Sequence, residues 1–451
     1  MTDPVVNHAP PPNGDTPEYR EQLLGGVQRS ALMVGLVGWI VFAVLAGLIF
    51  TQTSSEEGWK QLFLSYLTGF TFWMLIGFGS VFFLMIQYVT GGRWGILLRR
   101  PLEANAKTIA LGFVLFIPIA ISMWLGGNSM YWWSEHYDHM HHGDKPAASS
   151  ANNIENDPIN NVKPHLEFDE DEKVNDWLNP AFATVRGFLY IAIFFGLAMW
   201  LWRNARIAEY DENLDVARAA RNRQKYPASF GLFVFAATMT WIATDWIMSL
   251  EPTFTSSMFP VIMFDNAAVT AYSVGLLTLL YFKARGDTRF QNLFPATEQI
   301  HLGSLLLAFT LAWTYFNFSQ YMLIWIGNLP EEIPYYLKRT RGGWGWYAAL
   351  AVVFHFPIPF LLLLFRHVKS SPKALRNICI MLLAVIFIDV MWWISPSMSH
   401  EHSPKFYWLM DVAAWVGVGG VWIYVFLGQL KKHPLLPTRE VYLLEAYHHG
   451  H

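Results

Sequence analysis

Residues 31–51 read ALMVGLVGWIVFAVLAGLIFT, a stretch without one ionisable side chain. A helix of this length can cross the hydrocarbon core of a bilayer, which is about 30 Å thick and takes roughly 20 helical residues. Nine further apolar stretches follow, at 62–90, 107–127, 181–203, 228–250, 258–283, 297–326, 343–367, 374–397 and 405–429. The sequence therefore predicts an all-α integral membrane protein with ten transmembrane helices.

Composition supports this class, and the apolar stretches set the bounds of the membrane domain and of the two tails. Of the 451 residues, 53% are hydrophobic and 14% are charged, whereas a soluble domain carries about 25% charged residues. The ten stretches define a membrane domain over 31–429, with a tail of 1–30 before it and a tail of 430–451 after it. The first tail lacks the apolar core of a cleavable signal peptide, so the first helix is expected to act as the insertion signal.

The distribution of lysine and arginine predicts the topology. Counted over alternate connections, one side of the membrane receives 22 of these residues and the other receives 8. The positive-inside rule then places both termini in the cytoplasm, which agrees with an even number of helices. One connection weakens this pattern, because it belongs to the outer set and yet contains Lys338, Arg339 and Arg341.

The outer connection 128–180 is long and carries 11 acidic residues against three lysines. A solvated, partly disordered loop is the simpler interpretation, but the length favours a docking surface for an extrinsic partner. The loop also contains His136, His139, His141 and His142. Such a tract can bind a metal ion, but no second Cys or His group flanks it at fixed spacing. A metal site there is therefore the weaker interpretation.

Ionisable residues inside the predicted helices are the candidate functional residues, because hydrocarbon makes charged groups costly. They are Arg186, Asp245, Asp265, His301, His355, Asp389 and Asp411. Under the predicted topology, the arginine and the four aspartates lie in one layer toward the outside, and His355 lies near the middle of its helix. Glu298 and His301 lie at the cytoplasmic mouth of their helix, one turn apart and on one face.

Two interpretations of these residues remain open. Carboxylates and imidazoles can exchange protons, so they predict a polar path from Glu298 and His301 inside, through His355, to the aspartates outside. The alternative is structural: each acid pairs with Arg186 or caps a neighbouring helix, and so holds the bundle together. The structural interpretation is stronger for Asp245, which lies near a helix end and water.

Residues that would hold a redox cofactor are scarce. The single cysteine, Cys379, excludes an iron–sulfur cluster within this chain, and no CxxCH motif is present for a c-type haem. His301 and His355 are the histidines of the predicted helices, and they lie at different depths, so a b-type haem is not expected. No nucleotide-binding motif stands in a suitable context, and no nucleic-acid partner is expected.

Several stretches resemble the motifs of a known family. Residues 245–256 read DWIMSLEPTFTS, similar to the signature DWxMSLEPxWxST, and residues 318–332 read FSQYMLIWIGNLPEE, similar to FSQYxLIWxxNxPEE. Further matches are His355-Phe356-Pro357, Asp389, Trp392 and Pro396. Over roughly residues 20–440, the chain thus resembles the ActF family, the second NrfD/polysulfide-reductase-like membrane subunits of bacterial alternative complex III.

The resemblance implies an architecture and a role. The second to fifth helices would form one four-helix bundle and the sixth to ninth another, with the first and tenth helices peripheral. The chain would be a subunit of a quinol oxidoreductase of the bacterial inner membrane, which passes electrons to cytochrome c or another high-potential acceptor. In this family, quinol oxidation is placed in a sister NrfD-like subunit. The present subunit would be non-catalytic, without a redox centre of its own, and would provide a transmembrane proton path.

The same resemblance implies partners and cofactors. The partners would be the sister quinol-oxidising subunit, an iron–sulfur subunit, c-type cytochrome subunits, small membrane subunits and lipids. Whether a terminal oxidase is also a partner is left open. Haem c and iron–sulfur clusters would lie in the partner subunits. Whether a quinone or menaquinone binds this chain is also left open.

A proton- or ion-coupled secondary transporter is the alternative function. Ten helices with polar groups near the midplane fit such a protein. Transporters usually show broken helices in both halves, whereas here only the eighth predicted helix is clearly broken, by Pro357 and Pro359. The sequence therefore favours the membrane subunit of a redox complex.

Overall fold

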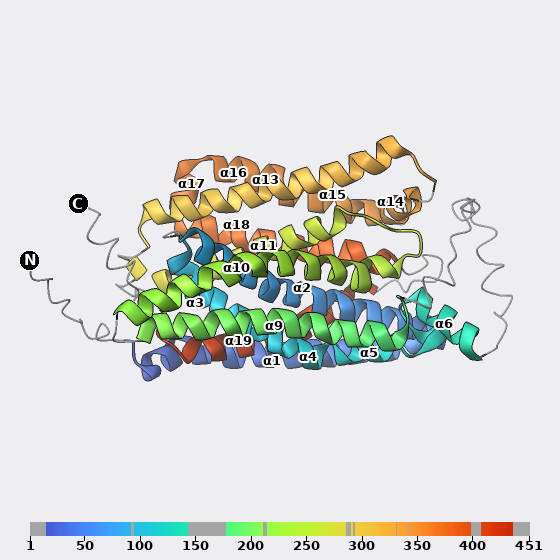
Figure 1. The fold of residues 1–451 in the computed structure, drawn as a ribbon. Helices are drawn as coiled ribbons and strands as arrows, with labels where there is room; N and C mark the ends of the chain where they lie inside the picture. The colour runs from blue at the N-terminus through green and yellow to red at the C-terminus, as the bar shows by residue number, and fades with distance from the viewer. Residues whose placement is uncertain are drawn as a thin grey trace, which may run out of the picture.

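The computed structural model describes residues 15–91, 94–142, 177–210, 214–285, 290–291, 294–330, 332–341, 343–397 and 407–435. Within these residues the chain forms helices and no strand. Ten helical segments in them are long and apolar enough to cross a membrane, and Figure 1 shows them running side by side. The predicted all-α class and the ten predicted membrane helices are therefore confirmed.

Of the first five membrane segments, the third is interrupted and the fifth ends in turns of other helix types. The first two are α1 (Pro17–Gln52) and α2 (Ser55–Thr90). The third consists of α3 (Trp94–Lys107), η1 (Thr108–Leu111), α4 (Gly112–Leu115) and α5 (Ile117–Ser122). The fourth is α9 (Pro180–Tyr210). The fifth is α10 (Leu214–Ile242), which ends in the π-helical turn η3 (Ala243–Ile247) and the 3-10 turn η4 (Met248–Leu250).

The last five membrane segments follow the predicted ranges closely. They are α11 (Phe259–Ala284), α13 (Ala296–Gly327), α15 (Trp344–His355) with α16 (Pro357–Leu364), α18 (Pro372–Ile394) with η5 (Ser395–Ser397), and α19 (Tyr407–Lys431). The shorter elements between the segments are η2 (Gly126–Asn128), α6 (Trp132–His142), α14 (Ile333–Thr340) and α17 (Arg366–Ser370).

Several membrane segments begin well before their apolar stretches, among them α1, the third segment and α10, which begins at Leu214 rather than at residue 228. α1 begins at Pro17 rather than at residue 31, after the N-cap Thr16, whose hydroxyl accepts a hydrogen bond from the backbone of Tyr19 (3.1 Å). The third segment begins at Trp94 rather than at residue 107. Hydropathy marks the apolar part of a helix, whereas capping and packing decide where the helix starts.

α2 is the centre of the bundle. In its most apolar stretch 89% of the residues are buried, against 22% in α1 and 22% in α15–α16. It packs against α3, α10, α11 and α19. Around it, α9 packs against both α3 and α10, and α11, α13, α15, α16 and α18 form a second group of neighbours. In Figure 1, α13 and α16 lie on one side of the molecule and α1, α9 and α19 on the other.

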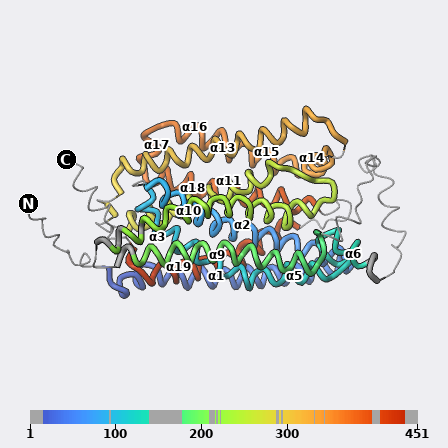
Figure 2. The backbone as a smooth tube through the Cα atoms, in the orientation of Figure 1, coloured from blue at the N-terminus to red at the C-terminus, as the bar shows by residue number. Residues whose placement is uncertain are grey.

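The two ends of the bundle differ. α1 begins and α19 ends at the same end, where the side-chain amide of Gln28 donates to the carbonyl of Tyr424 (2.8 Å). We call this the terminal end. The helices α6 and α14 lie at the opposite end, which we call the cap end (Figure 2). The ten segments therefore alternate in direction along the chain.

α1 and α19 touch through their backbones. A Cβ atom on Gly35 would lie 2.7 Å from the Cα atom of Gly420, and one on Gly38 would lie 2.7 Å from the backbone nitrogen of Gly417. Small residues at such a crossing let two membrane helices approach closely. The opposite face of α1 is exposed and apolar, with Met33, Val37 and Ile40 among its residues, as expected of a helix that faces lipid.

Replacing Gly35 with alanine is expected to push α1 away from α19, because the added methyl group meets backbone rather than a movable side chain. Overpacking of this kind costs about 1–3 kcal/mol. Gly47→Ala on the same helix is the matched control, since its Cβ would meet nothing within 4 Å. Thermal unfolding in detergent should show a lower midpoint for Gly35→Ala alone. Equal midpoints for the two variants would contradict the close crossing.

The cap end contains the basic residues that weakened the topology prediction. Arg339 on α14 is buried, with 1% of its surface exposed, and its Nη1 lies 3.4 Å from a carboxylate oxygen of Glu251. The same guanidinium donates to the carbonyl of Trp393 (2.7 Å), and Lys338 pairs with Glu251 (2.8 Å). Arg339 and Lys338 thus share one carboxylate within the cap, and Arg341 is exposed, so the described cap residues keep more basic than acidic charge here.

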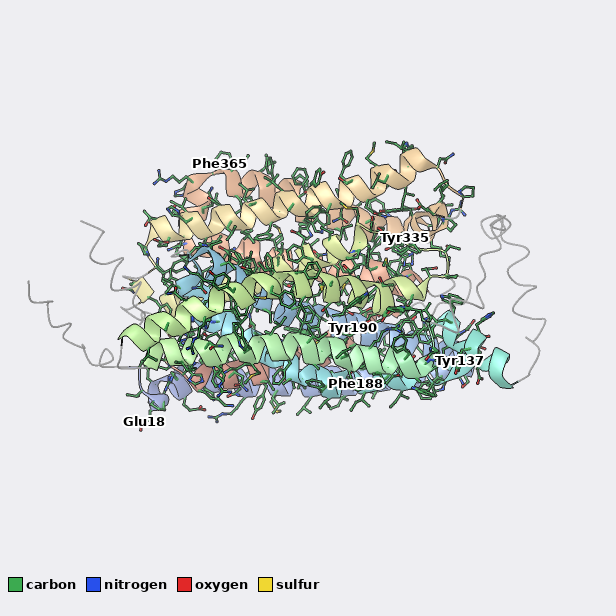
Figure 3. The ribbon with its side chains drawn as sticks, in the orientation of Figure 1. Glu18, Tyr137, Phe188, Tyr190, Tyr335 and Phe365 are labelled. Atoms are coloured by element: carbon green, nitrogen blue, oxygen red, sulfur yellow. The ribbon has the colours of Figure 1, made fainter. Side chains whose placement is uncertain are left out.

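Aromatic packing completes the cap. Phe254, which follows the fifth membrane segment, stacks on Tyr335 of α14 with ring centroids 3.6 Å apart. Figure 3 shows Tyr335 at this end of the bundle, whereas Phe365 lies on the outer side of the molecule near α17. Ser256 donates to Gln320 of α13 (2.7 Å). The two motif-bearing stretches 245–256 and 318–332 thus meet at the cap end.

The outer connection 128–180 is partly helical where it is described. It begins with η2 and α6, so residues up to 142 form an ordered start rather than an open loop. The acidic cluster Glu167–Glu172 lies outside the described residues, as do the side chains of His139, His141 and His142. The predicted docking role of this loop therefore stays a prediction.

Candidate functional site

The eighth and ninth membrane segments meet at a buried His–Asp pair. Nδ1 of His355, at the end of α15, lies 3.0 Å from Oδ2 of Asp389 on α18. The indole N–H of Trp313 on α13 donates to the same oxygen (3.1 Å), and its ring stacks on the imidazole with centroids 4.0 Å apart. His355 is fully buried and Asp389 exposes 4% of its surface. Three helices thus hold one carboxylate and one imidazole inside the bundle.

The break in the eighth segment places His355. α15 ends there, and Phe356 before Pro357 is distorted from ideal helical values (φ −116°, ψ −79°). A proline disfavours helical geometry in the preceding residue and supplies no backbone N–H. Pro359 therefore cannot donate to the carbonyl of His355, as residue i+4 of a regular helix would. The imidazole of His355 therefore lies at a local interruption of the helix, beside a backbone carbonyl that lacks its regular helical donor.

Asp265 on α11 belongs to the same cluster. It exposes 1% of its surface, and neither of its carboxylate oxygens has a hydrogen-bond partner among the described residues. Its helix α11 packs against α18, which carries Asp389, and against α13, which carries Trp313. Nε2 of His355 likewise lacks a partner in the described part of the chain. We call Asp265, His355, Asp389 and Trp313 the central cluster.

The chemistry open to the central cluster is proton exchange. Two carboxyl groups and one imidazole can each bind and release a proton, and a charged group in such surroundings is costly unless it is paired. The structure brings together Asp265, Asp389 and His355, which the sequence placed in two successive layers. His355 and Asp389 lie in direct contact because the kinked eighth helix packs against α18.

Asp245 and Arg186 form a separate ion pair. The Nε atom of Arg186 lies 2.8 Å from Oδ2 of Asp245, and both side chains are buried. Tyr190 donates to the same oxygen (2.7 Å), and the indole of Trp177 donates to the other (3.0 Å). Both carboxylate oxygens of Asp245 therefore have partners. This agrees with the interpretation that Asp245 and Arg186 pair to hold the bundle together. Figure 3 shows Tyr190 on α9.

The hydrogen bonds that hold the central cluster do not involve Asp411, Glu298 or His301. Asp411 on α19 is fully buried, and it accepts a hydrogen bond from Ser395 of η5 (2.7 Å). His301 lies on the exposed face of α13, and Glu298 is half-buried near the start of that helix. The predicted inner entrance of the path is therefore partly exposed, and its link to the central cluster stays a prediction.

Sequence reasoning missed two sets of residues. Trp313 was not a candidate, although a tryptophan far from the membrane boundary needs a partner for its N–H. A buried charged cluster was also missed: Arg99, Arg100 and Arg206 all reach Glu103, at 2.9, 3.1 and 2.7 Å. Its residues lie on two predicted inner loops, 91–107 and 203–227, which the structure shows as the buried helix α3 and the end of α9.

The described residues hold no group of three or more His, Cys, Asp or Glu side chains that could bind a metal ion. His136 of the histidine tract packs against Trp132, with ring centroids 6.3 Å apart, and whether the tract binds a metal ion stays open. Comparison with known proteins adds no identification. No family model matches the chain, and no curated protein matches it at a significant level.

Proposed function

We propose that this chain is a non-catalytic membrane subunit of a quinol-oxidising respiratory complex of the alternative complex III type. In this proposal the chain has no redox centre and carries part of a proton path across the bacterial inner membrane. The observation that carries the proposal is the central cluster: two carboxyl groups and one imidazole buried between α11, α13, α15 and α18. Intramembrane ionisable groups of this kind are typical of proton relays.

The packing of the helices supports the family resemblance. The second to fifth segments are neighbours, as are the sixth to ninth, which fits two four-helix bundles. α19 departs from a purely peripheral position, because 56% of its most apolar stretch is buried between α1 and α2. The motif residue Glu251 holds Arg339, and the motif residue Asp389 holds His355. The resembling stretches thus supply both the cap and the central cluster.

The proposal implies partners that carry the redox chemistry. They are a sister NrfD-like subunit that oxidises quinol, an iron–sulfur subunit and c-type cytochrome subunits. Haem c and iron–sulfur clusters would belong to these partners. The acidic connection 128–180 starts at the cap end with α6, which would put the docking surface on the periplasmic side.

Copurification tests the proposal. Affinity purification of the tagged full chain from its native membrane in mild detergent is expected to bring down haem-containing and iron–sulfur subunits, detected by haem staining and iron analysis. A variant lacking residues 144–172 should retain the membrane partners and lose most of the haem, because the acidic segment is missing. Purification of the intact chain alone, without haem or iron, would refute the assignment to a redox complex.

Labelling tests the proposed orientation. Cysteines introduced at Asn328, beside the cap, and at Ala219, toward the terminal end of α10, should react from opposite sides of the membrane. The native Cys379 is buried and should stay silent. An impermeant maleimide added to spheroplasts should label only the Asn328 variant. Labelling of Ala219 instead would place the terminal end in the periplasm and reverse the proposed topology.

A transporter is the second candidate, and one observation favours it. The expectation that only the eighth helix is broken was wrong, because the third is also interrupted by η1 and before Pro118. The third and eighth segments do not occupy corresponding positions in two four-helix halves, however, as paired broken helices in transporters do. The redox-complex subunit therefore remains the better-supported function.

A further inference from the structure

α13 is exposed although it is the least apolar of the membrane segments. Among the ten segments found in the described residues, its most apolar stretch has the lowest mean hydropathy, and only 28% of that stretch is buried. The two segments that are buried even less, α1 and α15–α16, are far more apolar. In Figure 1, α13 runs along one outer side of the molecule. Polar side chains in a membrane normally face protein or water rather than lipid, so the exposure of α13 requires an explanation other than contact with lipid.

The polar atoms on the outer side of α13 belong to two residues one helical turn apart. Tyr315 is 65% exposed and Ser319 is half-buried, and positions i and i+4 share a helix face. Neither hydroxyl has a hydrogen-bond partner among the described residues. By contrast, three other hydroxyls of α13 donate to the carbonyl four residues earlier: those of Ser304, Thr310 and Thr314. The hydroxyls of Tyr315 and Ser319 are therefore open to an outside partner.

The hydroxyl of Tyr315 lies deep in the membrane. Tyr315 is two residues from Trp313, whose indole reaches the central cluster, and α13 continues to Gly327, 12 residues further on. Twelve helical residues rise about 18 Å, which exceeds half of a hydrocarbon core of about 30 Å. Tyrosines at the membrane surface turn their hydroxyl toward water, but at this depth lipid offers no hydrogen-bond partner. A hydroxyl left in lipid there costs free energy.

The other exposed helices provide the contrast. The exposed residues of α15 and α16 between Ala349 and Leu364 are all apolar, as are Met33, Val37 and Ile40 on α1. Such faces are suited to lipid. α13 thus differs from the two segments that are similarly exposed, and its outer side is suited to a protein neighbour.

The side chains beside Tyr315 indicate what kind of helix fits. Leu311 is 42% exposed and Phe318 is 62% exposed, so this side of α13 is bulky. Membrane helices approach closely where small residues lie at the contact. Two identical chains related by a two-fold axis would bring the same patch of both together, and would set these bulky side chains against themselves. A different helix, with small residues opposite them, fits better.

We propose that a transmembrane helix of a different protein chain packs on the α13 face, which consists of Leu311, Tyr315, Phe318 and Ser319. The partner helix would carry glycine, alanine or serine opposite Leu311 and Phe318, and a hydrogen-bond acceptor opposite the hydroxyl of Tyr315. This contact is expected whether or not the chain belongs to a redox complex, because it follows from the exposure and the polarity of α13. The partner would also support the helix that brings Trp313 to the central cluster.

Photolabelling in the native membrane tests whether the α13 face is covered. A lipid-soluble diazirine reacts with side chains that face hydrocarbon, and mass spectrometry locates the labelled residues. In native membranes we expect label at Val353 and Leu361, on the apolar side of α15 and α16, and loss of most label at Leu311 and Phe318. In the full chain isolated in detergent, both sides should be labelled. Label at Phe318 in native membranes as strong as at Val353 would overturn the proposal.

Photocrosslinking identifies the neighbour. p-Benzoylphenylalanine in place of Phe318 is activated in native membranes, and the crosslinked peptides are sequenced. The expected product joins position 318 to a transmembrane segment of another protein that carries small residues at the point of contact. A product that joins two copies of this chain, or adducts with lipid alone, would refute the proposed partner.

The hydroxyls are tested by combining Tyr315→Phe with Ser319→Ala. The ratio of partner-bound to free chain at a fixed detergent concentration should fall roughly tenfold, since a hydrogen bond between membrane helices contributes roughly threefold. Thr240→Val on α10 is the matched control, because this exposed hydroxyl already donates to the carbonyl of Ala236 (2.9 Å). The control should leave the ratio unchanged. An unchanged ratio in the double variant would contradict the hydrogen-bonded contact.

These outcomes are separable from those that test the redox assignment. A covered α13 face in a chain purified without haem or iron would refute the redox assignment and support the α13 contact. Label at Phe318 in a membrane preparation whose purified complex contains haem and iron would refute the α13 contact alone.

Discussion

Asp389→Asn is expected to leave the bundle assembled and to lower proton movement by the complex about a hundredfold, the lower end of what a positioned proton-transfer group contributes. Asparagine keeps an oxygen that can accept from Trp313 and contact His355, both of which now share Oδ2 of Asp389. It cannot bind and release a proton. Asp265→Asn should act in the same way, because its carboxylate has no hydrogen-bond partner to lose within the described residues.

The measurement is quinol oxidation and pH change in reconstituted complex, with melting temperature measured in parallel. Asp245→Asn is the contrasting variant. It leaves Arg186 as a buried cation, so it should destabilise the protein by about 3–5 kcal/mol while its effect on proton flux follows the amount of folded complex. Unchanged proton stoichiometry in Asp265→Asn, Asp389→Asn and His355→Phe would assign the central cluster a purely structural role.

Arg339→Met is expected to destabilise the cap by about 3–5 kcal/mol, the cost of breaking a buried ion pair. The substitution leaves Glu251 without its buried cation and removes the donor to the carbonyl of Trp393. Lys338→Met is the matched control on the same helix. Lys338 pairs with the same carboxylate but is 35% exposed, so its loss should cost about 1 kcal/mol or less.

Thermal unfolding of the purified protein in detergent measures both variants. The double variant Arg339→Met with Glu251→Gln should recover part of the loss, because it removes the carboxylate charge left behind in the single variant. Equal midpoints for Arg339→Met and Lys338→Met would show that Glu251 is not buried in the cap.

Much of the fold could be predicted because hydropathy is a strong signal over 20 residues. The same signal fails where polar residues are buried by protein rather than by lipid. Arg99, Arg100 and Glu103 were predicted to lie on an inner loop, yet both arginines pair with the glutamate inside the helix that leads into the third segment. Arg339 made the topology prediction ambiguous for the same reason. Its partner Glu251 lies 88 positions away in the sequence, so the buried pair could not be recognised.

The candidate site was predicted in its residue types but not in its grouping. Depth along each helix could be estimated from the topology, whereas the direction in which a side chain faces depends on which helices become neighbours. Hydropathy therefore could not separate Asp245, which pairs with Arg186, from Asp389, which meets His355. Nor could it show that His301 faces outward from α13.

The glycine crossing of α1 and α19 has a consequence for biogenesis. Gly38 meets Gly417. After it has added Gly38, the ribosome must therefore add nearly 400 further residues before both sides of this contact exist. At about 5–20 residues per second, that takes roughly 20–80 s. During this interval the glycine face of α1 is covered by lipid or by the insertion machinery. Chains halted before α19 would keep that face open, where quality-control proteases of the membrane could recognise them.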